Sequence, residues 1–192
     1  MFVVLENLSR REVVKRYVEY DARKKGTLMP ADIDEWDWND PNAIDEKLEL
    51  NTFKPGVIAG FRQWDLVQLS RDDLLQCAIV NSIEEFAGLQ VLGCLFLHPK
   101  FKDWKPVCPK SWYESLETGK PFPPEWAMIL RPAVSSESPA KWYIEDGSGR
   151  AICFLRRLMR HEDDKSLAYG YLGKNPDHSS KFMQCHFREL LK

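Results

Sequence analysis

The stretch WYIEDGSGRAICFLRRL, from Trp142 to Leu158, decides how the last third of the chain folds. Its first residues are typical of a strand, two glycines flank Ser148, and apolar residues then recur with helical spacing. The sequence therefore predicts a strand, a tight turn and a helix in immediate succession. Arg150 follows the turn, at the end of the helix where the partial positive charge of the backbone disfavours a cation.

Two explanations account for a cation at this position, and the sequence leaves both open. An anion bound at the start of the helix would reverse the cost, because unpaired N–H groups, the Ser148 hydroxyl and a guanidinium all favour phosphate oxygens. Alternatively, Ser148 is only an N-cap, and Arg150 is solvated or pairs with Glu145 or Asp146. The pattern is not a Walker A motif, and Ile152 occupies the place of the third glycine of a dinucleotide fingerprint.

The composition is that of an ordinary globular protein, with 192 residues, 44% hydrophobic residues and a formal net charge of -2. This charge gives no global basic field, so any nucleic-acid contact needs a local patch. The five cysteines contain no Cys-x-x-Cys pair, which favours reduced thiols. The longest apolar stretch, Leu89 to Leu97, is too short to cross a bilayer. We expect a cytoplasmic protein without an integral membrane segment, free or held at the inner membrane through a partner.

The rest of the chain mixes helix and strand signals. The capping-box pattern from Ser9 to Glu12 predicts a helix over 9–25, and residues 27–56 are expected to be irregular. Further helices are predicted after Ser70, after Ser82, after Ser111 and from Ser179 to the end, and the helix after Ser70 is expected to include Ala78. Strands are predicted at 64–69, 125–132, 141–146 and 166–173. This order favours an α+β fold, a small mixed sheet surrounded by helices. We expect one domain over 1–192, with 1–60 as a helical and irregular extension packed on it.

The strand, the turn and the Gly-x-x-Arg sequence that opens the helix resemble the ParB/sulfiredoxin superfamily over about residues 125–175. The resemblance implies a ParB/sulfiredoxin-like domain that binds the phosphates of ATP or a related nucleotide through Gly147, Ser148, Gly149 and Arg150. Ser148 lies where sulfiredoxins keep a reactive cysteine, and Gly149 where they keep a histidine. Sulfinic-acid repair is therefore not expected, since serine cannot replace a low-pKa thiolate.

Within the superfamily, the size of the chain and its DGSGR sequence look most like the plasmid fertility-inhibition (oncogenic suppression) proteins. This likeness implies an enzyme, a hydrolase with ATPase and DNase activities, that inhibits conjugative or T-DNA transfer. Its partners would be a nucleotide, DNA without strong sequence preference, and components of the transfer apparatus.

Phosphoanhydride and phosphodiester hydrolysis need charge neutralisation, a metal or cation, and an oriented water. The candidate catalytic residues are Glu145, Asp146 and Arg150. Glu145 and Asp146 are hard oxygen ligands that could hold Mg²⁺ or orient water, or they could cap the turn. Successive strand residues point to opposite faces, so both carboxylates reach one site only if the strand has already ended at Asp146.

A local basic surface is predicted beside this site, formed by Arg156, Arg157, Arg160 and Lys174. It is either a DNA contact or an ordinary solvated face. Two other functions stay open. One is a non-catalytic interaction protein that blocks a partner in the transfer apparatus through its Trp- and Pro-rich middle. The other is a small-molecule kinase, because serine is a phosphate acceptor within the superfamily.

Overall fold

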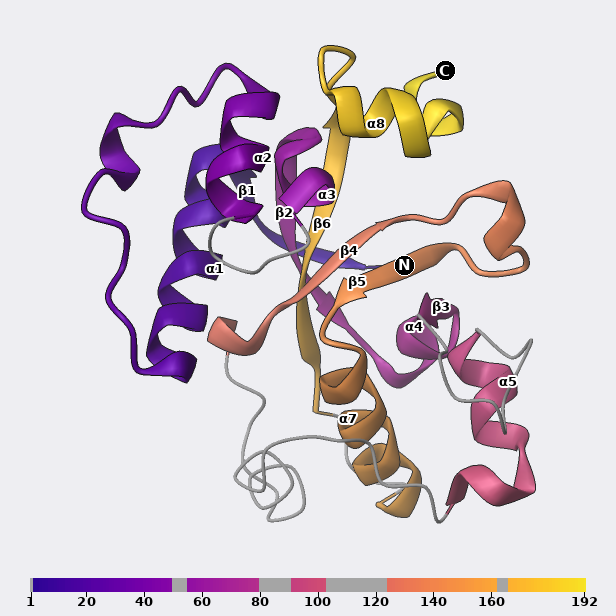
Figure 1. The fold of residues 1–192 in the computed structure, drawn as a ribbon. Helices are drawn as coiled ribbons and strands as arrows, with labels where there is room; N and C mark the ends of the chain where they lie inside the picture. The colour runs from indigo at the N-terminus through magenta and orange to yellow at the C-terminus, as the bar shows by residue number, and fades with distance from the viewer. Residues whose placement is uncertain (1, 50–54, 80–90, 103–123, 162–165) are drawn as a thin grey trace.

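A six-stranded mixed sheet runs through the computed structural model, which describes residues 2–49, 55–79, 91–102, 124–161 and 166–192 (Figure 1). In sheet order the strands are β1 (Val3–Ser9), β2 (Phe61–Leu69), β6 (Ala168–Pro176), β4 (Met128–Pro132), β5 (Trp142–Asp146) and β3 (Cys77–Ile79). The β3–β5 and β4–β6 pairs are parallel, and the other three are antiparallel. The α+β class and the mixed sheet expected from the sequence are confirmed.

Helices pack on both faces of this sheet (Figure 1). The α-helices are α1 (Arg10–Lys25), α2 (Pro41–Glu49), α3 (Pro55–Ala59), α4 (Arg71–Leu75), α5 (Leu92–Leu97), α7 (Ser148–Arg160) and α8 (Lys181–His186). Short 3₁₀ segments are η1 (Ile33–Glu35), η3 (Pro99–Lys102), η4 (Pro124–Trp126), η5 (Ser135–Glu137) and η6 (Arg188–Leu191). Within the described ranges, no helix has the length and apolar character needed to span a membrane.

Two apolar clusters lie on opposite faces of the sheet. One joins the sheet to α1, α2, α3 and α8, and the other joins it to α4, α5 and α7. Alternation along β4 places Ile129 in the first cluster and Met128 and Leu130 in the second. Because both faces of β4 are covered, its first three residues are apolar and buried, and Arg131, which follows them, is buried with two ion-pair partners.

Local capping signals in the sequence agree with the structure. The Glu12 amide donates to Ser9 Oγ and the Ser9 amide donates to the Glu12 carboxylate, which is the predicted capping box. Gly26 ends α1 at φ 67°, in the left-handed region that glycine adopts readily. Ser70 and Asp73 form a second reciprocal cap at the start of α4. The starts of both predicted helices are confirmed.

The N-terminal segment differs from the prediction. Val3–Ser9 forms the edge strand β1, so the segment 1–60 contributes a strand to the sheet itself. Most β1 side chains are exposed, and the strand is held by its backbone pairing with β2, so it lacks the alternating pattern that reveals a strand. Residues 41–49, expected to be irregular, form α2.

Two other helix predictions are corrected, and two more lie wholly or partly outside the described residues. The helix after Ser70 ends at Leu75, and Ala78 belongs to β3, which pairs in parallel with β5. The predicted C-terminal helix breaks at Phe187, whose ring lies 4.2 Å from the Arg131 guanidinium. The helix expected after Ser111, and the first part of the one expected after Ser82, lie outside the described residues.

Candidate functional site

The predicted strand, turn and helix are present, and one glycine makes the turn. β5 ends at Asp146 and α7 begins at Ser148, with only Gly147 between them at φ 100°. A Cβ atom at Gly147 would lie 2.6 Å from Met128 Cγ. Both the backbone conformation and the available space therefore require glycine at this position.

The start of α7 lacks the side-chain cap that the structure shows at α1, α4 and α8, where Ser9, Ser70 and Ser180 accept from backbone amides. Gly147 is the N-cap of α7, so the structure does not support the alternative in which Ser148 is the N-cap. The three residues 147–149 are half-buried. The first-turn amides of a 13-residue helix thus lie near solvent without a capping side chain.

Arg150 points into the protein and pairs with Asp146, which is one of the two explanations left open by the sequence. Its Nη1 donates to the carbonyl oxygens of Trp126 at 2.8 Å and Ala127 at 3.0 Å, and its Nη2 donates to the Asp146 carboxylate. The Arg150 side chain is 2% exposed. The carboxylate at the helix start offsets the unfavourable position of the cation. Direct contact between Arg150 and phosphate stays a prediction.

The two acids of β5 do not come together. Glu145 accepts a hydrogen bond of 2.6 Å from Arg131 Nε, whereas Asp146 pairs with Arg150. Because β5 includes Asp146, the two side chains point in opposite directions, and only Asp146, 41% exposed, lies at the turn.

The described residues hold no group of three His, Cys, Asp or Glu side chains suited to a metal ion. Mg²⁺ usually takes one or two carboxylates together with substrate phosphates, and Asp146 is the only one of the two predicted ligands that lies at the turn, so a magnesium site there stays a prediction.

Two tyrosines of α1, which sequence analysis did not single out, surround the same ion pair. The Tyr17 hydroxyl donates a hydrogen bond to the Asp146 carboxylate. The pKa of Tyr17 is raised, mainly by burial and further by the negative charge of Asp146. The Tyr20 ring lies 5.3 Å from the Arg150 guanidinium, and burial raises the pKa of its hydroxyl. The helical spacing of these residues indicated only a packing face. Their place beside the turn follows from how α1 docks on the sheet.

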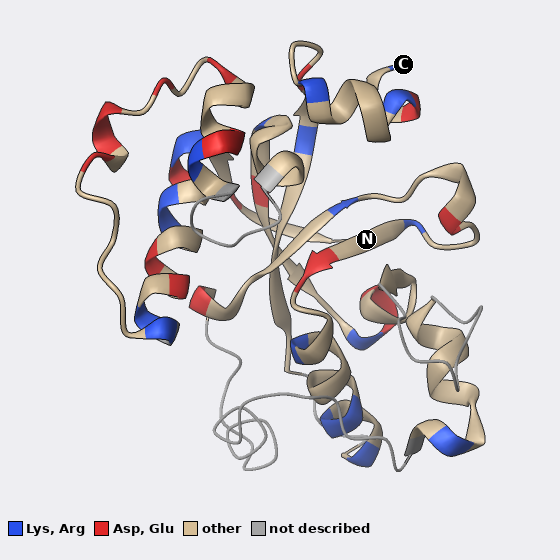
Figure 2. Cartoon of the chain, viewed as in Figure 1, with Lys and Arg blue, Asp and Glu red and all other residues tan. Residues whose placement is uncertain are grey.

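The four residues predicted to bind DNA do not form one surface. Arg157 is buried and donates to Ser166 Oγ at 3.1 Å, and half-buried Arg156 donates to the Phe101 carbonyl at 2.8 Å. Arg160 is exposed at the end of α7. Lys174 lies near the C-terminal end of β6, about 20 Å from Ala168, the first residue of that strand. In Figure 2 the basic positions of α7 and of β6 lie toward opposite ends of the molecule. A DNA contact by these residues stays a prediction.

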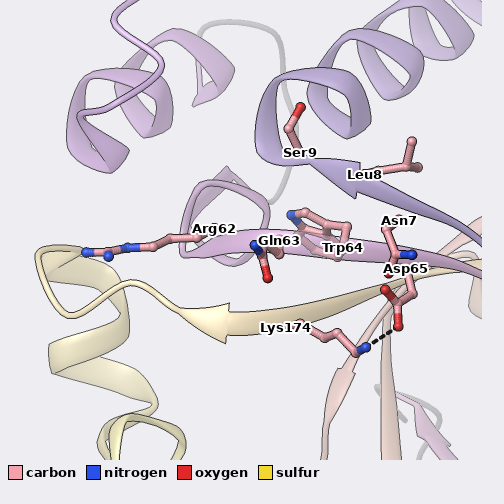
Figure 3. A pocket seen from close by; sticks show the side chains of 8 residues that line it. All are labelled: Asn7, Leu8, Ser9, Arg62, Gln63, Trp64, Asp65 and Lys174. Carbon is pink, nitrogen blue, oxygen red and sulfur yellow. Dashed lines mark ion pairs between the residues drawn. The ribbon is translucent and has the colours of Figure 1, made fainter.

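Two adjoining hollows, of about 490 and 570 Å³, lie at the end of the sheet: the smaller is lined by β1, β2 and β6, and the larger by the start of α1, residues 38–39 and Asp177. Ser9 and Arg62 line both, and Lys174 lines the smaller one, where it pairs with buried Asp65 (Figure 3). We call this feature the Arg62 groove. Sequence analysis missed it, because its residues come from segments far apart in the chain.

An ionic cluster forms the floor of the larger hollow. Asp177, with a side chain 3% exposed, accepts from Arg10 Nη2 at 2.5 Å and from Arg62 Nη2 at 3.0 Å. Arg10 also donates to the Phe61 carbonyl at 3.0 Å. Burial would raise the pKa of Asp177, but hydrogen bonds from Arg62, Arg10 and Ser179 outweigh it and hold the pKa below its usual value. Asp177 is therefore charged at neutral pH.

The fold and the turn define an α+β protein with a mixed sheet in which a left-handed glycine joins a strand directly to a long helix. No protein-family model matches the chain, and comparisons with curated proteins and with solved structures give no match.

Proposed function

We propose that this protein binds the phosphates of ATP or a related nucleotide at the turn formed by Gly147, Ser148 and Gly149, and hydrolyses the nucleotide. The observation that carries the proposal is the start of α7, a 13-residue helix whose first-turn amides have no capping side chain and lie in a half-buried turn. Such amides, with the partial positive charge of the helix, favour an anion.

Each residue of the turn has a role in this proposal. The backbone amides that open α7 and the Ser148 hydroxyl donate to phosphate oxygens. Asp146 orients the attacking water and would hold Mg²⁺, which when bound neutralises phosphate charge. Arg150 positions Asp146 and fixes the carbonyls of Trp126 and Ala127 beneath the turn. Glu145 is committed to Arg131 and supports the strand instead.

DNA cleavage without strong sequence preference and inhibition of conjugative or T-DNA transfer are proposed with it. They are supported by the resemblance of the DGSGR turn to the fertility-inhibition proteins of the ParB/sulfiredoxin superfamily.

The alternative, a non-catalytic interaction protein, is favoured by a different observation. The edge strand β1 exposes Val3, Val4 and Leu5 by 57%, 48% and 47%. An exposed apolar edge strand can pair with another chain.

Ser148→Glu is expected to abolish nucleotide binding while making the fold slightly more stable. A carboxylate in the first turn stabilises the helix by about 0.3–1 kcal/mol, yet it repels phosphate from the same amides. Titration with a fluorescent ATP analogue measures binding, and thermal unfolding measures stability. Ser148→Ala is the matched control and should keep most of the affinity. Binding by Ser148→Glu equal to that of the wild type would place the nucleotide elsewhere.

Asp146→Asn is expected to slow ATP hydrolysis about 100-fold or more while nucleotide binding is kept, because it removes the charge of the acid at the turn. Phosphate release is measured with ATP and Mg²⁺, and plasmid nicking is followed in parallel. Glu145→Gln should have a much smaller effect, since Glu145 pairs with Arg131. No turnover by the wild-type protein would favour the interaction protein, and transfer of phosphate to a free amino acid would favour the kinase.

A further inference from the structure

We propose that the smaller hollow of the Arg62 groove binds an uncharged sugar through hydroxyl groups on adjacent carbons, with Asp65 as the main ligand. We call it the Asp65 hollow; it measures about 490 Å³ and is lined by residues of β1, β2 and β6. This volume is in the range of small-molecule sites. Its lining residues are distinct from those of the Gly147 turn, so the proposal does not rest on nucleotide binding there.

Four polar side chains of the hollow lie on one face of the sheet, namely those of Asn7, Gln63, Asp65 and Lys174. Asn7 is opposite Asp65 in the β1–β2 pairing, and Gln63 is opposite Lys174 in the β2–β6 pairing. Gln63 and Asp65 are two residues apart on β2, so both pairs point to the same side. In Figure 3, Gln63 and Asp65 are directed away from the Trp64 ring, and Lys174 reaches Asp65.

Asp65 is a buried carboxylate with few donors. Its side chain is 3% exposed, and the Lys174 ammonium is its only partner in the part of the chain that the structure describes. Asp177, equally buried, accepts from Arg10, Arg62 and the hydroxyl and amide of Ser179. An ionised carboxylate has about four acceptor sites, and buried acceptors are normally hydrogen-bonded. The remaining sites of Asp65 therefore favour a ligand that donates hydrogen bonds.

The two amides beside Asp65 can complete such a site. Asn7 is exposed, and its side chain has no hydrogen-bond partner within the described ranges. The Gln63 carbonyl oxygen accepts from Asn175 Nδ2 at 2.5 Å, which leaves the Gln63 NH₂ group as a donor. The hollow thus combines an anionic acceptor, a cationic donor and two amides at the surface of a sheet.

The charges favour a neutral ligand. Lys174 balances Asp65, whereas Arg62, at the edge of the hollow, points to the opposite face of the sheet and pairs with Asp177. A free anion would meet the Asp65 carboxylate, and an ammonium ligand would compete with Lys174. Two hydroxyls on adjacent carbons can donate to the carboxylate and accept from the ammonium and amide groups. An acidic residue holds ribose hydroxyls in the same way in dinucleotide-binding folds.

The test titrates ¹⁵N-labelled protein with methyl β-D-ribofuranoside, which carries neither base nor phosphate, and follows the amide signals by NMR. We expect a dissociation constant on the order of 1 mM, with the largest shifts at the four residues of the hollow. Asp65→Asn should weaken binding about tenfold, because it removes the charged acceptor, and Gln63→Ala about threefold. Asp32→Asn is the matched control, since Asp32 also pairs with a lysine, Lys47, but lies outside the hollow.

The ligands themselves provide a second comparison. The 2-deoxy analogue lacks one hydroxyl of the adjacent pair and should bind at least tenfold more weakly. Binding of methyl α-D-mannopyranoside in place of the riboside would support the site and assign it to hexoses. Circular dichroism verifies that each variant is folded, and Gln63, which is exposed, decides the result if Asp65→Asn does not fold.

Four results would overturn the proposal. They are no binding of either glycoside, equal binding of the 2-deoxy analogue, shifts confined to residues outside the hollow, and an equal loss in Asp32→Asn. Tighter binding of putrescine than of both glycosides at the same residues would also overturn it, because the hollow would then select amines.

Discussion

Replacing Arg131 with methionine is expected to lower the free energy of unfolding by about 3–5 kcal/mol, the cost of removing one partner from a buried ionic network. Arg131 is 3% exposed and forms two ion pairs of 2.6 Å, one with Glu137 and one with Glu145. Its guanidinium also lies 4.3 Å from the Tyr143 ring and 4.2 Å from the Phe187 ring. Methionine would fill the space but leave two buried carboxylates without a cation.

Urea denaturation at neutral pH, followed by tryptophan fluorescence, measures this loss. The triple variant Arg131→Met, Glu137→Gln, Glu145→Gln should recover more than half of it, because the uncompensated charges are gone. Arg23→Met is the control, since Arg23 forms an exposed i,i+4 pair with Glu19 and should change stability little. A loss below about 1 kcal/mol in the single variant would mean that solvent compensates the network.

Replacing Asp177 with asparagine is expected to cost about 3–5 kcal/mol at neutral pH, because the buried Arg10 guanidinium would lose its counter-ion. The two side chains are 3% and 6% exposed, and they join the C-terminal end of β6 to the start of α1. Urea denaturation again gives the magnitude. Asp34→Asn is the matched control. Asp34 also accepts from two cations, Arg11 and Lys15, but it is 65% exposed, so its replacement should change stability little.

The same variant should also change the pH dependence of stability. The pKa of Asp177 is lowered in the folded protein, so its contribution is fully present above the pKa of the unfolded chain and is lost as the pH falls. The wild type should therefore lose stability between about pH 5 and pH 2 more steeply than Asp177→Asn. Parallel pH profiles of the two proteins would contradict a charged, paired Asp177.

Features that depend on neighbouring residues in the chain could be predicted. The capping boxes at Ser9 and Ser70 are reciprocal bonds between residues three apart, so the starts of α1 and α4 were visible in the sequence. The break at Gly147 was equally local, because a left-handed backbone and a crowded Cβ position both demand glycine. The apolar run Met128–Leu130 in β4 reflected a strand covered on both faces.

Features that depend on pairing between distant parts of the chain could not be predicted from the sequence. β3 is a strand because it pairs with β5, and β1 is held by backbone bonds to β2 while all its side chains except Leu8 stay exposed. The Arg62 groove depends on Arg10 and Asp177, which are 167 residues apart in sequence and are brought together by the sheet order.

The sequence by itself determined where α1 and α4 start, where the backbone turns at Gly147, and that an acidic pair and an arginine flank the turn. Only the tertiary structure decided which acid faces the turn and where the arginine points. Strand alternation separates Glu145 from Asp146, and the packing of α1 and η4 around the turn buries Arg150 against two carbonyl oxygens. Local patterns reflect hydrogen bonds within a few residues, whereas the direction of a charged side chain is set by the partners that folding brings near.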